Sequence, residues 1–96
     1  MVIIMIRKKT DGSMIDDLFN LIASIDNAED CRLFFNDLCT NKEIEQMAER
    51  VRAAKLLIEG KTYNQIIEQT DISSATLSRI SRCVQYGNGY SSFLNK

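Results

Sequence analysis

The sequence contains no histidine and no proline, and it has only four glycines and three cysteines. Without histidine there is no ordinary imidazole base, and nothing to complete a zinc site with Cys31, Cys39 and Cys83. The cysteines are odd in number and lack a C-x-x-C spacing, so we expect reduced thiols in a core. A glycine-rich phosphate loop is also missing. These absences argue against an enzyme, a metal site and a bound cofactor.

Long hydrophobic runs are missing as well. The opening MVIIMI is apolar, but it is far shorter than the roughly 20 residues that a helix needs to cross a bilayer. Basic residues follow this run, whereas in a signal peptide they precede it. We therefore expect a cytoplasmic protein with no membrane partner. Residues 1–13 are predicted to be a flexible tail, and residues 14–96 a single domain.

The composition favours an all-α fold. Hydrophobic residues make up 45% and charged residues 26%, which is ordinary for a globular protein. With so few helix-breaking residues, the chain is expected to be helical throughout. Its 96 residues can form one modest core, so a second subunit is expected to contribute and the protein to be a dimer.

Capping residues predict where the first three helices begin. Ser13 is expected to cap MIDDLFNLIASI, and Asn27 to cap AEDCRLFFNDLC. Thr40 and Glu43 form a capping box that opens the longest helix, and Gly60 suits the left-handed residue that ends it. The apolar stripe of this helix is Ile44, Met47, Ala48, Val51, Ala54, Leu57 and Ile58.

Two shorter helices follow. Thr62 caps YNQIIEQT, and Ser73 caps SATLSRISRCVQY, which ends at Gly87. In the first, the residues expected to face inward are Tyr63, Ile66, Ile67 and Thr70. In the second, Leu77, Ile80 and Val84 form an apolar face opposite Ser74, Ala75, Ser78, Arg79 and Arg82. Two short helices joined by a tight turn are typical of a helix-turn-helix, here over about residues 62–86.

Charge is distributed unevenly along the chain. The net charge of -1 taken alone argues against a nucleic-acid partner. However, residues 72–96 contain Arg79, Arg82 and Lys96 and no acidic residue, whereas residues 1–71 hold nine basic and thirteen acidic residues. Since only the local potential acts on a phosphate backbone, the C-terminal quarter is expected to attract DNA.

The residue types on the last helix suit the major groove. The small side chains of Ser73, Ser74, Ala75 and Thr76 at the helix start would let the backbone approach the groove floor, where hydroxyls bond base edges and alanine contacts a thymine methyl. Arg79 would reach a guanine edge or a phosphate, and Arg82 the sugar-phosphate backbone. An alternative interpretation is that Ser73 and Ser74 are only helix caps and that the arginines form a solvated face.

Four stretches also resemble a known family: FFNDLCT, ERVRAAKLLIEGKTYNQI, SSATLSRISRC and YGNGY. Through them, residues 37–90 resemble the Trp-repressor family, and most closely its YerC/YecD branch. The resemblance implies an all-helical, intertwined homodimer in which the early helices of both subunits build a shared core. It further implies two reading heads that bind a two-fold operator in double-stranded DNA.

The resemblance also implies roles for individual residues. Residues 62–70 would be the supporting helix with Gln65 and Glu68 flanking the DNA, and the base-reading residues would be Ser74, Ala75, Thr76 and Ser78. In tryptophan-binding members two arginines hold the corepressor. The matching residues here are Arg50 and Arg79, and Thr40 matches a pocket threonine. Ile80 and Cys83 replace a glycine and a serine of that pocket, and the bulk of Ile80 argues against tryptophan as corepressor.

These observations predict a sequence-specific DNA-binding transcriptional regulator, a repressor, without catalysis. A hypothesis from another class is a helical interaction module whose degenerate helix-turn-helix binds a protein. A third keeps the effector pocket for a different small molecule. Steep salt dependence of duplex binding would distinguish the first hypothesis from the second.

Overall fold

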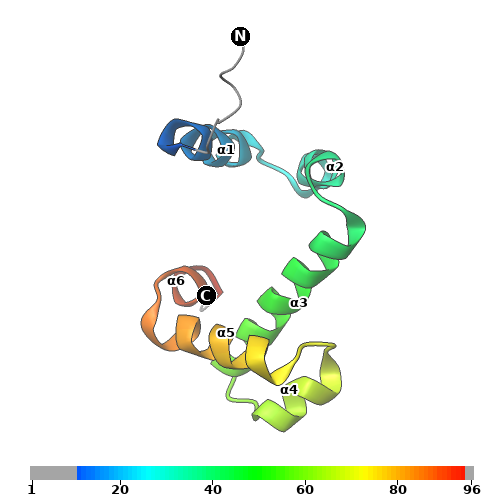
Figure 1. Cartoon of the computed structure of the whole chain (residues 1–96), viewed down its shortest axis with the longest axis vertical. Coiled ribbons are helices and arrows are strands. Elements are labelled where there is room, and N and C mark those ends of the chain that lie inside the picture. Colours follow the sequence, from blue (N-terminus) through cyan, green and yellow to red (C-terminus); the bar gives the residue numbers. More distant parts are fainter. Residues whose placement is uncertain (1–10, 95–96) are drawn as a thin grey trace, which may run out of the picture. The chain divides into compact units, whose positions relative to one another are not determined.

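A computed structural model describes residues 11–94, so the predicted tail lies largely outside the described residues. Within residues 11–94 the chain forms six helices and no strand, which confirms the predicted all-α fold (Figure 1). The helices are α1 (Gly12–Ser24), α2 (Ala28–Leu38), α3 (Asn41–Ile58), α4 (Tyr63–Gln69), α5 (Ser74–Tyr86) and α6 (Gly89–Leu94).

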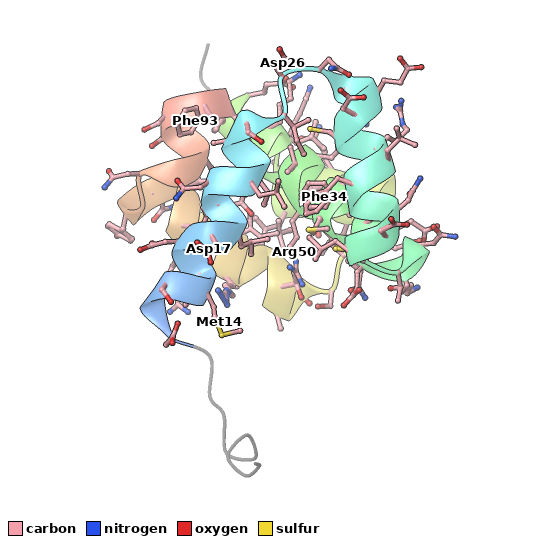
Figure 2. The ribbon with its side chains drawn as sticks, turned by 90° about the horizontal axis from the view of Figure 1, so that it is seen from above. Met14, Asp17, Asp26, Phe34, Arg50 and Phe93 are labelled. Atoms are coloured by element: carbon pink, nitrogen blue, oxygen red, sulfur yellow. The ribbon has the colours of Figure 1, made fainter. Side chains whose placement is uncertain are left out.

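The chain divides into two compact units, with the boundary between Leu38 and Cys39. In the first unit, neither α1 nor α2 has a buried residue. Figure 2 shows Met14 and Asp17 on α1 and Phe34 on α2. The rings of Phe34 and Phe35 meet edge to face, with centroids 5.6 Å apart and planes at 81°. The first unit therefore has many apolar side chains and little core of its own.

The cap of α1 differs from the prediction. Asp11, not Ser13, is the N-cap: its carboxylate accepts from the Met14 amide at 3.0 Å and from the Ser13 hydroxyl at 2.8 Å. Both residue types are good caps, but a carboxylate also gains from the positive end of the helix macrodipole. The bonds from Met14 and then Ser13 lower the pKa of the Asp11 carboxyl. The predicted cap at Asn27 is confirmed, since its side-chain oxygen accepts from the Asp30 amide at 2.8 Å.

Both ends of α3 are as predicted. The Thr40 hydroxyl accepts from the Glu43 amide at 3.1 Å, and the Glu43 carboxylate accepts from the Thr40 amide at 2.8 Å. At the other end Gly60 has φ +91°, in the left-handed region. The amides of Gly60 and Lys61 bond to the carbonyls of Leu57 and Leu56, each at 3.0 Å, which closes the helix in a Schellman motif.

The core of the second unit gathers where α5 packs across the C-terminal half of α3 (Figure 1). Its buried residues are Ala53, Ala54, Leu56, Ile66, Ile72, Leu77 and Ile80. The short helix α6, which the sequence patterns did not predict, packs against both α3 and α5. Its Tyr90 and Leu94 pack on the edge of this core. The α4–α5 pair is thereby packed on α3, with α6 against α5.

For two residues of α4, the prediction that the side chain faces inward is wrong. Tyr63 is 41% exposed and Ile67 39% exposed, while Ile66 is fully buried. A helix of seven residues has only about two turns, so one central side chain makes most of its contact with α3 and α5. On α3, too, Met47 and Val51 of the predicted stripe are exposed, because the other helices of this unit pack on its C-terminal half.

Candidate nucleic-acid interface

The start of α4 and its connection to α5 are fixed by side-chain hydrogen bonds. The Thr62 hydroxyl accepts from the Gln65 amide at 3.2 Å, and Gln65 Oε1 accepts from the Thr62 amide at 2.8 Å, a second capping box. The four residues 70–73 connect the two helices. Within them the Thr70 hydroxyl donates to the Ile66 carbonyl at 2.8 Å and accepts from the Ile72 amide at 3.4 Å. Because Ile72 is buried in the core, this connection has a defined path.

The start of α5 is capped by Ser73, as predicted. The Ser73 hydroxyl accepts from the Thr76 amide at 3.2 Å and donates to the Thr76 hydroxyl at 3.0 Å. Both of these side chains are therefore engaged in shaping the helix start. Ser74 and Ser78 are exposed, whereas Thr76 is partly buried and the Ser73 hydroxyl, although exposed, is bonded at the helix start, so Ser74 and Ser78 are better placed to contact an external ligand.

The two faces of α5 are divided as the sequence predicts. Leu77 and Ile80 are buried, and Ser81 joins them although the periodicity did not indicate it. The opposite face is exposed and carries Ser74, Ala75, Ser78, Arg79 and Arg82. The helix ends at Gly87, whose amide bonds to the Cys83 carbonyl at 2.9 Å. This exposed face presents small side chains first and guanidinium groups one to two turns later.

Residues 72–96 alone do not determine which charged side chains surround α5. A hollow of about 260 Å³ at its N-terminal end is lined by Glu45, Glu49 and Asp71 as well as Lys42 and Arg50. An adjacent hollow contains Glu68 together with Glu49 and Asp71. The fold thus brings carboxylates from α3 and the connection beside the start of the acid-free helix α5. Neither of these two hollows is lined by Arg79 or Arg82.

The fold brings together four of the five predicted effector-pocket residues. A hollow of about 380 Å³ is lined by Arg50, Thr76, Arg79, Ile80, Cys83 and Tyr90. Thr40 is not among them, and its hydroxyl takes part in the cap of α3. Ile80 is only 3% exposed and packs into the core as expected, yet the hollow stays open beside it. Tyr90 was missed because it lies on α6.

Within residues 11–94, no group of three or more His, Cys, Asp or Glu side chains is arranged to hold a metal ion. None of the helices in this described range is long and apolar enough to cross a membrane. The exposed face of α5 and the hollow between Arg50 and Arg79 carry hydroxyl and guanidinium groups that can bind an external ligand.

Comparison with known proteins identifies the family. The family model for the Trp repressor protein matches residues 13–96. The chain belongs to the Trp repressor family. YerC of Bacillus subtilis, an uncharacterized protein, is 48% identical over 80 residues, which cover 83% of this chain and 77% of YerC. The resemblance found in the sequence motifs is confirmed.

Solved structures agree with the family assignment. A proposed Trp repressor from Staphylococcus aureus superposes with a TM-score of 0.83 at 38% identity, covering 88% of this chain and 86% of that one. A TrpR-like protein from Eubacterium eligens gives a TM-score of 0.82 at 37% identity, covering 86% and 87%. Membership of the Trp repressor family indicates a DNA-binding regulator and not an enzyme.

Proposed function

We propose that the protein is a sequence-specific DNA-binding transcriptional repressor in which α4 and α5 act as a helix-turn-helix. The observation that carries this proposal is the exposed face of α5, where small side chains precede two arginines opposite the buried Leu77 and Ile80. A helix of this kind can enter the major groove at its N-terminal end because no bulky side chain holds it away from the bases.

The contacts divide by chemistry. Ser74, Ala75 and Ser78 read base edges, while Arg79 bonds a guanine or a phosphate and Arg82 a phosphate. Ser73 and Thr76 act mainly by fixing the helix start, since their hydroxyls are bonded to each other. On α4, the exposed Gln65 and Glu68 flank the DNA.

The repressor acts as a homodimer in the cytoplasm. Support comes from α1 and α2, where large apolar side chains are exposed, for example Phe19 at 62% and Leu33 at 67%. Monomeric soluble proteins rarely expose so many large apolar side chains together, and a second copy of the chain would cover them. A two-fold dimer of this type reads half-sites about one helical turn, roughly 34–36 Å, apart.

Tryptophan is not required for binding. Ile80 stands where tryptophan-binding members have a glycine, and its burial against Leu77 supports a reading helix that is held in place by packing. A second candidate keeps an effector: the hollow between Arg50 and Arg79 offers two guanidinium groups to a small anionic molecule. A ligand could shift DNA binding only by preferring one of two conformations.

The salt dependence of duplex binding tests the DNA proposal. The logarithm of the binding constant should fall steeply and linearly with the logarithm of salt concentration, and Arg82→Ala should reduce that slope by about one. Arg32→Ala on α2 is the matched control, because it removes the same charge from the other compact unit. Weak binding with a flat salt slope would favour the protein-interaction module instead.

A further inference from the structure

Glu49 differs from the other charged residues of the chain. It lies in the middle of α3 and is half-buried, whereas every other charged side chain within residues 11–94 is exposed. A carboxylate in a partly buried position is stabilised by hydrogen-bond donors nearby. A specific partner for this side chain is therefore expected.

That partner is the backbone of the α4–α5 connection. Glu49 Oε2 accepts a hydrogen bond from the Asp71 amide, 22 residues away in the sequence, at 3.4 Å. The capping bonds of Thr40, Thr62 and Ser73 reach only three residues along the chain. The Glu49 carboxylate instead ties two separate elements, α3 and the connection, to each other.

Two amides of the connection bond to side-chain acceptors. Backbone amides between two helices have no helical carbonyl to bond, so they bond to side chains or to water. Thr70 accepts from the Ile72 amide, and Glu49 accepts from the Asp71 amide. Ile72 then enters the core and Ser73 caps α5. The position of Asp71 therefore helps to fix where α5 begins.

The hydrogen bond of Glu49 would favour DNA binding by positioning α5, whereas its negative charge would disfavour it. Its carboxylate lines a hollow with Glu45 and Asp71 beside the N-terminal end of α5, where phosphates would approach. A negative charge there weakens phosphate binding. Hydrogen-bond acceptance and charge can be separated, because glutamine keeps an acceptor oxygen and loses the charge.

We propose that Glu49 is a positioning residue for the reading helix: it holds the α4–α5 connection on α3 through the Asp71 amide. Its effect on DNA affinity rests on the proposed function, whereas its effect on the connection does not. The test therefore has one readout without DNA and one with DNA.

The first readout is the solvent-exchange rate of the Asp71 amide, measured by nuclear magnetic resonance in the absence of DNA. Glu49→Met and Glu49→Ala remove the acceptor and should speed exchange about three- to tenfold. Glu49→Gln should stay within about twofold of the unaltered protein, on the same scale of hydrogen-bond strength. Glu45→Met, which removes an exposed carboxylate from the same hollow, is the control and should not change the rate.

The second readout is affinity for a selected duplex. Glu49→Met and Glu49→Ala should bind several-fold more weakly, Glu49→Gln at least as tightly as the unaltered protein, and Glu45→Met no more weakly. Unchanged Asp71 exchange in both acceptor-free variants would overturn the proposal, as would Glu49→Gln exchanging as fast as Glu49→Ala. Failure of every protein to bind duplex would refute the DNA proposal alone, since the exchange rates would still decide the role of Glu49.

Discussion

Replacing Ile80 by alanine tests whether α5 is held in place by packing. Ile80 is 3% exposed and belongs to the core cluster with Ala54, Ile66 and Leu77. The substitution deletes three carbon atoms, worth roughly 2.4 kcal/mol at about 0.8 kcal/mol for each buried methylene. A cavity term is added because the neighbours relax only partly, so we expect a loss of about 3 kcal/mol in the free energy of unfolding.

Urea unfolding followed by circular dichroism measures this loss. Protein concentration must be held constant, because the proposed dimerisation would couple stability to concentration. Ser78→Ala is the control: Ser78 is exposed on the same helix, so its effect should stay within about 0.5 kcal/mol. A loss below about 1 kcal/mol for Ile80→Ala would refute the claim that this side chain anchors the reading helix.

Further predictions concern both units and the site. Gly60→Ala should cost about 1 kcal/mol of unfolding free energy, because its φ of +91° strains any side chain; thermal unfolding checks this. The lowered pKa of Asp11 means that its stabilisation of the α1 start is present above its ordinary value of 3.8 and is lost as pH falls through the lower folded-state pKa. The Met14 amide resonance should report this loss, and Asp11→Ala should abolish the transition. Arg79→Ala should cost about 1 to 3 kcal/mol of binding and relax specificity, which competition between duplexes measures. Calorimetric titration with tryptophan should give no saturable binding; a several-fold rise in DNA affinity on adding tryptophan would contradict this.

Features set by neighbouring residues could be predicted from the sequence. Helix starts and ends are examples: they depend on residues only a few positions apart, so local sequence rules predict them. These rules correctly gave the N-caps Thr40, Thr62 and Ser73 and the helix end at Gly60. Asp11 replaced the predicted Ser13 because two good caps lie two residues apart and local rules rank them almost equally.

Features set by tertiary packing could not be predicted in this way. Nothing in the spacing of Glu49 and Asp71 indicates that a carboxylate on α3 meets an amide of the connection. The helix α6 has a weak local signal, with Gly89 at its first position, and forms where it packs on α3 and α5. That Arg50 and Arg79 line one hollow could be predicted only through the family resemblance, because 28 residues lie between them in the sequence.

Selection of bound duplexes from a random pool determines whether α5 reads a DNA sequence. We expect enrichment of a two-fold symmetric sequence whose half-sites lie about one helical turn apart, with the enrichment lost in the Arg79→Ala, Arg82→Ala double variant. A pool that stays random after repeated rounds, with a folded protein, would contradict the assignment of α5 as a sequence-reading helix.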